Sequence, residues 1–452
     1  MARRKASEVA LRRLRGAIAN MASRPEECAR SPGTDFTRAR KLPLERLLWL
    51  LVAWGEDTIS AELADHFGWD GGAPTASAFC QQRAKLGPDV MPGLHAEFLG
   101  AWHNVPFMGR FRLVAADGTG VQLPPSRDPR TRVRSGAGSA EHNEAHPTVL
   151  YDVRRGTFED MVWQGSKEQD EPGAFCELVD RFEPGEAPDG TPLEALALGD
   201  RNFCTYNTLW HLLSRGFSFV LRARDDWVER FVGAGEVPGG CFDVDVERVI
   251  IRTESLSARS RPDEPEAYRR IRAAIRFDGI ARGSRDECPL AVRVVRRAIP
   301  RRDGDPNASG DRWLNLVTNL PRDEFRARWL VRTYKRRWSQ EVGFRHLKHV
   351  VGMRDPRTRD FDRARDEVWG RLTLFNACVL GTRATLARRT RGRKRRRAAD
   401  LTMAFKAMLR LIRGQDVDVE AVLGRHAHVV EGGRHFARRK RNRSPPRMGY
   451  RH

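Results

Sequence analysis

Long apolar runs are missing from this sequence of 452 residues. A helix that spans a membrane needs about 20 consecutive apolar residues. The longest apolar-rich piece, residues 44–54, is broken by Glu45 and Arg46. The basic residues at the start of the chain are followed by no apolar stretch, so we expect no secretory signal peptide. These absences argue against a membrane partner and predict a protein of the cytoplasm.

Cysteine is also scarce. The seven cysteines are dispersed, odd in number and never spaced as Cys-x2-Cys, which disfavours a zinc ribbon or a disulfide framework and fits a reducing compartment. His142 and His146 have a spacing that suits metal binding on a helix. Their order, His-x-Glu-x-His, is not the His-Glu-x-x-His pattern of metalloproteases, and Pro147 ends any helix there. We therefore expect these histidines to lie in a loop without a metal.

Acidic residues are fewer than basic residues in this sequence. Lys and Arg together number 81 against 59 Asp and Glu, which gives a net charge of +22, while the apolar fraction of 40% is that of a globular protein. Solubility alone does not require so one-sided a charge. An excess of arginine, which can bind phosphate in a bidentate manner, indicates a partner with many phosphates.

One stretch, YKRRWSQEVGFRHLK (334–348), carries an unusual pattern. Relative to Tyr334, the residues Arg337, Glu341 and Lys348 are offset by three, seven and fourteen positions. A helix turns about 100° per residue, so these side chains fall within about 60° of one another, and Arg345 shares their face. Apolar residues beside this stripe can anchor the helix to a core: Phe344, Leu347, Val350 and Val351. Such a face is ordinarily solvated, but one carboxylate framed by cations also suits a metal beside a polyanion.

Two aspartates elsewhere favour the metal interpretation. Asp117 ends the apolar run 113–116 and is followed by turn-forming glycines, and Asp200 ends the apolar run 195–199 in the same way. A single aspartate at the end of a strand usually caps a turn. Two of them with Glu341 form a more specific set, because three converging carboxylates can hold two divalent cations about 3.5–4 Å apart.

These segments resemble the signature blocks of insertion-sequence DDE transposases. The blocks are DGT (117–119), DRNF (200–203) and the Tyr-x2-Arg-x3-Glu-x6-Lys pattern, which resembles the YREK signature of the insertion-sequence-four family. Similar sequence segments at 77–86 and 315–321 extend the resemblance over roughly residues 35–380. Asn202 is a departure, since such proteins often have Gly there, but Asn tolerates a left-handed turn.

The resemblance implies a ribonuclease-H-like fold in which Asp117, Asp200 and Glu341 are the catalytic residues and hold two Mg²⁺ ions, with Mn²⁺ as a substitute. It also implies contacts to phosphates near the scissile bond by a second set of residues, of which the last two are weaker candidates: Tyr334, Arg337, Lys348, Arg345 and Arg201.

The activity implied is cut-and-paste transposition of an insertion sequence. Water hydrolyses a phosphodiester at the element end, and the freed 3′-hydroxyl then attacks the opposite strand or target DNA. The expected partners are double-stranded DNA, namely terminal inverted repeats and target, and a second copy in a homodimer on DNA. A bacterial, nucleoid-associated location follows. Two alternatives stay open: a junction resolvase or other nuclease on the same fold without strand transfer, and a non-catalytic DNA-binding protein derived from a transposase.

The organisation along the chain is of the mixed α/β type. We predict a helical N-terminal DNA-binding region, a ribonuclease-H-like core in two parts separated by a β-rich insertion, and a basic C-terminal region. Their ranges are 1–105, 106–222 with 314–385, 223–313, and 386–452. In the first core part we predict strands at 111–116, 148–154, 157–163, 194–199 and 217–222, and helices at 170–183 and 205–215. In the insertion we predict strands at 242–252, 274–280 and 290–299.

Three further segments have two interpretations each. The segments 59–69 and 76–86 form either a helix-turn-helix that reads DNA or plain helical packing, with Gln81, Gln82, Arg83 and Lys85 exposed in both cases. Trp227 and Trp313 either stack on an unpaired base or pin the insertion to its core. The basic runs 387–397 and 437–443 are either solvated tails or clamps on the DNA backbone, and 399–414 between them has helical spacing.

Overall fold

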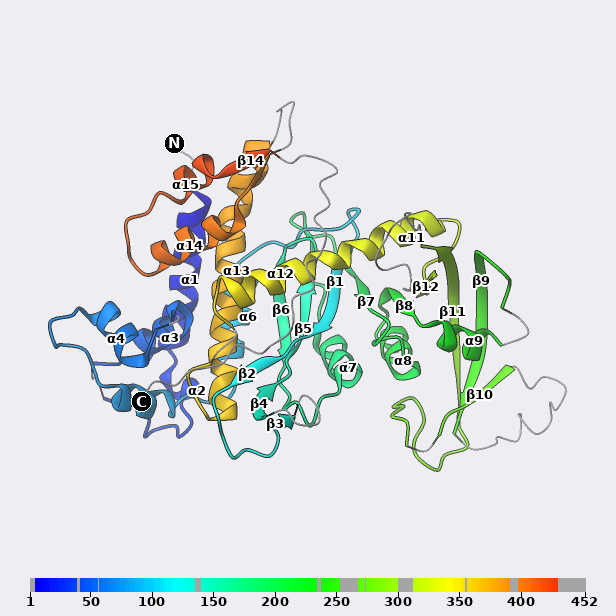
Figure 1. Cartoon of the computed structure of the whole chain (residues 1–452), viewed down its shortest axis with the longest axis horizontal. Coiled ribbons are helices and arrows are strands. Elements are labelled where there is room, and N and C mark those ends of the chain that lie inside the picture. The colour runs from blue at the N-terminus through cyan, green and yellow to red at the C-terminus, as the bar shows by residue number, and fades with distance from the viewer. Residues whose placement is uncertain are drawn as a thin grey trace.

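The computed structural model describes residues 5–38, 41–55, 57–134, 140–233, 237–252, 267–272, 274–299, 312–353, 356–390 and 397–429. A large sheet crosses the molecule, and a bundle of helices stands at one end of it (Figure 1). The architecture is the mixed α/β, ribonuclease-H-like fold that the sequence predicted. The limits of the five predicted domains stay predictions.

Five strands form the ribonuclease-H-like part of this sheet. They are β1 (Phe111–Gly118), β5 (Thr148–Asp152), β6 (Thr157–Val162), β7 (Glu194–Gly199) and β8 (Ser218–Ala223). β1, β5 and β6 pair antiparallel, whereas β7 runs parallel to β1 and β8 parallel to β7. β1 and β7, at the centre of these five, are mostly apolar and buried because helices cover both faces. The predicted strand positions are therefore confirmed to within two residues.

The β-rich insertion does not stand apart from the core sheet. Its strands continue the sheet beyond β8, and the complete strand order is β10-β9-β11-β12-β8-β7-β1-β5-β6. The strands of the insertion are β9 (Phe242–Ile251), β10 (Tyr268–Arg270) and β11 (Glu287–Ala298). β12 (Trp313–Thr318), at the start of the second predicted core part, pairs with both β11 and β8 and so joins them to the core. A separate three-stranded sheet, ordered β2-β4-β3, lies below the core: β2 (Val121–Leu123), β3 (Arg132–Arg134) and β4 (Glu141–Ala145).

The prediction of a strand at 274–280 is wrong. This segment is a loop wrapped around the guanidinium of Arg252, which is buried. The guanidinium donates hydrogen bonds to the carbonyl oxygens of Ile275, Phe277 and Ile280 at 3.3, 2.8 and 2.9 Å. Backbone groups that a strand would pair with a neighbour are thus satisfied by one side chain from the end of the insertion strand β9.

Helices cover the two faces of the sheet differently. α7 (Glu171–Arg181), α8 (Tyr206–Ser214) and α9 (Asp225–Val232) share one apolar cluster with Val114 and Ala116 of β1. α11 (Ala327–Tyr334) packs on the opposite face, in a cluster with Leu113 and Ala115. Successive strand residues point to opposite faces, so odd-numbered β1 residues face α11 and even-numbered ones face α7.

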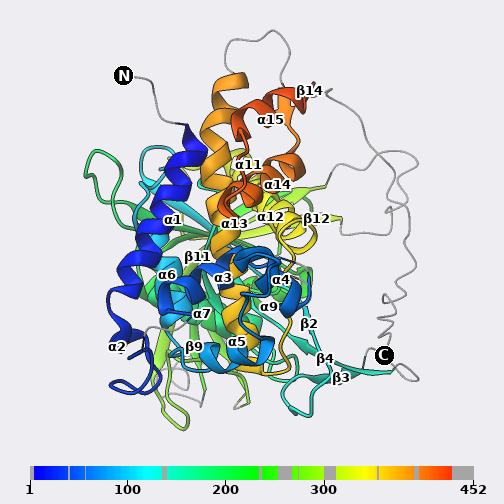
Figure 2. The ribbon, with the colours of Figure 1, turned by 90° about the vertical axis from the view of Figure 1, so that its left-hand side faces the viewer.

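The helical bundle joins both ends of the chain. Its members are α1 (Ala6–Ala22), α2 (Pro25–Cys28), α3 (Leu44–Ala53), α4 (Ile59–Phe67), α5 (Ala76–Arg83), α6 (Val90–Gly100), α13 (Phe361–Thr390), α14 (Leu401–Ile412) and α15 (Val419–Arg425). Figure 2 shows α1 running beside the long helix α13. α13 also packs on the sheet, where Phe375 contacts Phe158 of β6 with ring centroids 4.9 Å apart. Two short strands, β13 (Arg397–Ala399) and β14 (Ala427–Val429), pair at the bundle's end.

The N-terminal DNA-reading surface predicted on 76–86 is only partly exposed. Gln81 is exposed and Lys85 half-buried, but Gln82 and Arg83 are buried. Arg83 forms an ion pair with the buried Glu367 of α13, and this pairing is why the prediction of its exposure is wrong. Eight residues, 68–75, separate α4 from α5, whereas a helix-turn-helix has a turn of about 3–4 residues. The geometry favours helical packing.

Two expectations concern the C-terminal region and the membrane. The predicted helix at 399–414 is present as α14. Residues 391–396 of the first basic run and the whole run 437–443 lie outside the described residues. Across the described part of the chain, no helix combines the length and apolar character needed to cross a membrane.

Candidate active site

Two parallel strands place Asp117 and Asp200 side by side. β1 and β7 are neighbours, and their register pairs Ala115 with Leu198. Each aspartate stands two residues further along its strand than these partners, at the carboxyl ends of the pair. The alternation of side chains then directs both carboxylates to the same face, because Leu113, Ala115, Leu196 and Leu198 all lie in the cluster that contacts α11.

Local hydrogen bonds fix both strand ends. The backbone N–H of Gly118 donates to Oδ1 of Asp117 at 3.0 Å, and the N–H of Asn202 donates to Oδ1 of Asp200 at 2.8 Å. Phe203 then turns back into the core, fully buried against Phe175 of α7. Each aspartate therefore keeps one oxygen on its own turn and directs the other outward.

The segment 334–348 is not one continuous helix, as the sequence predicted, but three consecutive pieces. α11 ends at Tyr334, a 3-10 turn occupies Lys335–Arg337, and α12 runs over Trp338–His349. The chain keeps a right-handed helical path, so α11 and α12 lie almost in line along the sheet (Figure 1). Phe344, Leu347 and Val351 are buried, as predicted, and hold α12 on the core.

Arg337 connects the acids from the two parts of the chain. Its Nη1 lies 3.5 Å from Oδ2 of Asp117, and its Nη2 lies 3.2 Å from Oε1 of Glu341. Burial lowers the pKa of Arg337, but the charges of Tyr334, Asp117 and Asp200 raise it further than burial lowers it. One partly buried guanidinium is thus the counter-ion that Asp117 and Glu341 share.

Asp117 is the most perturbed of these acids. Burial, together with the negative charges of Asp200 and Glu171, raises the pKa of the Asp117 carboxyl to about 7, even though Arg337 opposes the rise. A carboxyl group whose ionised form is this costly to keep is a strong ligand for an added cation.

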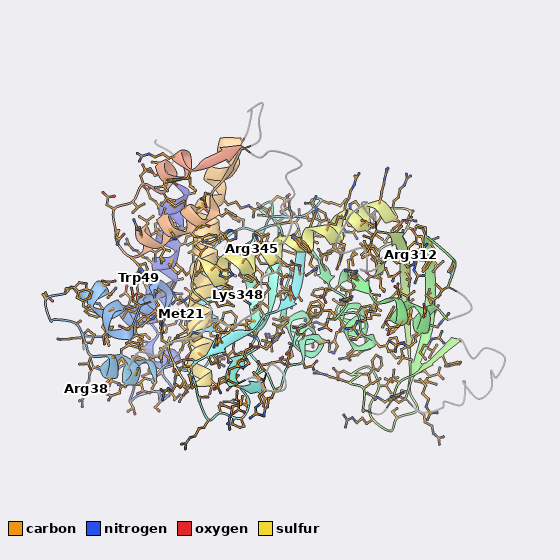
Figure 3. The ribbon with its side chains drawn as sticks, in the orientation of Figure 1. Met21, Arg38, Trp49, Arg312, Arg345 and Lys348 are labelled. Atoms are coloured by element: carbon orange, nitrogen blue, oxygen red, sulfur yellow. The ribbon has the colours of Figure 1, made fainter. Side chains whose placement is uncertain are left out.

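The other predicted DNA-contact residues lie along α11 and α12. Tyr334 is buried, and burial raises the pKa of its phenol. Lys348 is half-buried in the last turn of α12 and Arg345 is exposed on the same helix (Figure 3). Lys348 follows Glu341 by seven positions, about 10 Å along a helix axis. Arg201 is exposed in the turn directly after Asp200.

The two tryptophans of the insertion differ from each other. Trp227 is buried and stacks on Phe231 with ring centroids 4.8 Å apart, which favours the core interpretation. Trp313 is half-buried beneath the guanidiniums of Arg312 and Arg296, at 5.0 and 5.7 Å from its ring centroid. Figure 3 places Arg312 well away from Lys348 and Arg345.

Sequence reasoning missed two features. Glu171 lies in the first turn of α7, close enough to influence Asp117, but a glutamate beside Pro172 looks like an ordinary helix start. Arg328, Arg332 and Arg336 form an exposed row on α11 and the turn after it. The spacing of four residues between them was a visible signal. Like charges so spaced repel, and within the described residues none of the three has an ion-pair partner.

A ribonuclease-H-like sheet with two strand-end aspartates and a helical glutamate defines a class of nucleases and DNA-joining enzymes. The family comparison makes this specific: the model described as "Transposase DDE domain" matches residues 109–377, more than half of the 452 residues. The chain therefore belongs to the transposase DDE domain family and is a DDE transposase, an enzyme that acts on DNA. DDE transposases use divalent metal ions.

Among solved structures, the chain is similar to a piggyBac transposase synaptic complex with hairpin DNA. The identity is 9%, the TM-score is 0.39, and the match covers 90% of this chain and 70% of that chain. No curated protein matches the sequence.

The donor groups at this site fit a hard divalent cation. All three predicted ligands are carboxylates, which suit Mg²⁺ or Mn²⁺. Within the described residues no three His, Cys, Asp or Glu side chains are grouped closely enough to be metal ligands. Here Arg337 contacts both Asp117 and Glu341 and supplies the positive charge.

Proposed function

We propose that this chain is a cut-and-paste transposase of the insertion-sequence-four type, with Asp117, Asp200 and Glu341 as the ligands of two Mg²⁺ ions. The observation that carries the proposal is the shared counter-ion: one guanidinium touches Asp117 and Glu341, and Asp200 continues the register beside Asp117. Two of the three acids thus contact one positive group, and the charge of the third, Asp200, also raises the pKa of that group.

The bound ions would activate the attacking oxygen and stabilise the leaving oxygen of the scissile phosphodiester. The side chains of the protein do the remaining work. Tyr334 and Arg337 hold a phosphate beside the carboxylates, and Lys348 and Arg345 hold the strand further along α12. Arg337 would be free to bind this phosphate if bound cations supplied the counter-charge for Asp117 and Glu341.

The proposed reaction has two steps, hydrolysis and strand transfer. In the first, water adds to phosphorus at the element end and the 3′-oxygen leaves with a proton. In the second, this 3′-hydroxyl attacks a target phosphodiester, loses its proton and displaces the 3′-oxygen of the target strand. The two DNA ends are proposed to be brought together by a homodimer.

The direct test is Glu341→Gln. It removes a charge from the proposed metal site but keeps the size of the side chain. We expect loss of Mg²⁺-dependent cleavage of element-end DNA by at least about 1,000-fold, with DNA binding in EDTA within about twofold of the wild type. Glu177→Gln, an exposed change on α7, is the matched control and should cleave normally. Undiminished cleavage by the Glu341→Gln protein would overturn the assignment.

A second assay separates transposition from simple nuclease action. Pre-cleaved element ends with a free 3′-hydroxyl are incubated with supercoiled target DNA and Mg²⁺. Joined products are expected from a transposase. A resolvase on the same fold would cleave branched DNA but join nothing, and a non-catalytic derivative would do neither.

A further inference from the structure

Three turns meet behind the two aspartates. The first follows Asp117, the second is 145–147 after β4, and the third follows Asp200. The N–H of Thr119 donates to the carbonyl oxygen of Pro147 at 3.0 Å, so the first two turns are already joined through the backbone. The turn after Asp200 belongs to another strand and needs a different connection.

Glu171 supplies that connection. Its Oε1 accepts a hydrogen bond from His146 Nε2 at 2.6 Å, and its Oε2 accepts one from Asn202 Nδ2, also at 2.6 Å. Gln169 Nε2 lies 3.1 Å from the same His146 nitrogen and 3.4 Å from Oε1 of Glu171. One carboxylate therefore spans the turn that precedes β5 and the turn that follows Asp200.

The space around Gly118 shows how close this contact is. A Cβ atom at position 118 would lie 2.2 Å from Oε1 of Glu171 and 2.4 Å from Nε2 of His146. Residue 118 is even-numbered, and even-numbered residues of β1 face α7. Glu171 thus approaches the aspartates from the face opposite to α11 and α12.

We propose that Glu171 is a positioning residue that fixes the spacing of Asp117 and Asp200 through His146 and Asn202. The inference rests on the proposed role of these two aspartates as metal ligands. It gives a structural role to His146 and Asn202, neither of which is among the proposed metal ligands. His146 is neither catalytic nor a ligand but a donor to Glu171. Asn202, the departure from the family pattern, supplies a side-chain amide that glycine could not.

The position of Glu171 argues against a ligand role. Both of its oxygens already accept short hydrogen bonds, and it belongs to the helix behind the sheet. A third carboxylate this close raises the cost of ionising Asp117, because Glu171 is among the charges that raise the pKa of that group. The hydrogen bonds that Glu171 accepts from His146 and Asn202 offset part of this repulsion.

The first experiment compares Glu171→Ala with Glu177→Ala, an exposed change on the same helix. Displacing a reacting group by about 1 Å can cost about 100-fold in rate. We expect Glu171→Ala to lower kcat for cleavage about 10- to 100-fold, with KM for DNA unchanged within about twofold. It should also weaken Mn²⁺ binding about 10-fold in a titration followed by electron paramagnetic resonance without DNA. An unchanged kcat and Mn²⁺ affinity would overturn the proposal.

Rescue by a conservative change separates positioning from ligation. Glu171→Gln keeps an oxygen acceptor for Asn202, so it should retain at least about a third of wild-type kcat, whereas a ligand would behave like Glu341. A Glu171→Gln protein as inactive as Glu341→Gln would overturn the proposal in favour of a further metal ligand.

A double-mutant cycle of Glu171→Ala with Asn202→Ala tests whether Glu171 influences cleavage through Asn202. If Glu171 acts through Asn202, the double variant should lose no more than about twofold beyond Glu171→Ala alone. Fully multiplicative losses would overturn the proposed connection. Asn202 is exposed, so Asn202→Ala can be measured alone if Glu171→Ala fails to fold, and an unchanged kcat for Asn202→Ala would then overturn the proposed connection.

Asp117→Asn separates failure of this inference from failure of the proposed function. Normal Mn²⁺ binding by Asp117→Asn would overturn the metal assignment itself. Loss of Mn²⁺ binding in Asp117→Asn together with wild-type binding in Glu171→Ala would overturn the positioning role alone.

Discussion

Replacing Asp117 by asparagine should stabilise the metal-free protein at alkaline pH. The carboxyl is partly buried, and this burial together with the charges of Asp200 and Glu171 raises its pKa from 3.8 to about 7. Asparagine has nearly the same shape but cannot ionise. The variant therefore lacks the energetic cost of keeping a charge at this position.

The sign follows from proton linkage. Between about pH 4 and pH 7 the unfolded chain has lost the Asp117 proton and the folded protein still holds it, so stability falls as pH rises. The cost is fully present above the folded pKa and absent below the unfolded one. A shift of about three units corresponds to about 4 kcal/mol at most. Relaxation around a side chain that is 24% exposed lowers the expected gain to about 2 kcal/mol.

The assay is urea unfolding in EDTA at about pH 8 and about pH 4.5, with Asp323→Asn, an exposed change, as control. The Asp117→Asn midpoint should exceed the wild type at the higher pH, and the difference should be several-fold smaller at the lower pH, which lies closer to the unfolded pKa of 3.8. Saturating Mn²⁺ should stabilise the wild type more than the variant, since only the wild type keeps all proposed ligands. A variant that is less stable at the higher pH would refute the reasoning.

Three further predictions concern packing and DNA. Glu367→Gln leaves the buried guanidinium of Arg83 without a counter-charge, and the free energy of unfolding should fall by about 3–5 kcal/mol, measured by urea denaturation. Phe158→Ala removes a fully buried ring from the contact between sheet and bundle and should cost about 3–5 kcal/mol in the same measurement. Arg328→Ala and Arg332→Ala should each lower the salt dependence of DNA affinity by about one counter-ion in anisotropy titrations, whatever the DNA sequence.

The strand-end aspartates could be predicted because their signal is local. An apolar run that ends at an acid and continues into a turn describes both Asp117 and Asp200. The spacing of Arg337 and Glu341 is likewise local, and a 3-10 turn alters it little because it keeps the helical path. The parallel register that brings the aspartates together depends on long-range pairing and had to be supplied by the fold.

Long-range partners account for the errors. Arg83 looked like a surface cation because its partner, Glu367, is 284 residues away in the sequence. The segment 274–280 has the apolar pattern of a strand, but Arg252 takes its carbonyl oxygens. Glu171 resembled a helix start for the same reason, since His146 and Asn202 become its neighbours only in the folded sheet. A side chain that hydrogen-bonds to a polar group far away in the sequence produces no periodic pattern from which the contact could be predicted.

The charges at this site favour the binding of a divalent cation. Burial and neighbouring acids raise the pKa of the Asp117 carboxyl to about 7, and in the described part of the chain the guanidinium of Arg337 forms ion pairs with both Asp117 and Glu341. A stronger set of counter-ions would stabilise the fold but would compete with metal for the same oxygens. A single arginine keeps the carboxylates in place and can still be turned toward a phosphate, because its side chain lies on the short turn between α11 and α12. The surroundings that make ionisation of the Asp117 carboxyl unfavourable in the metal-free protein therefore also favour the binding of a cation to it.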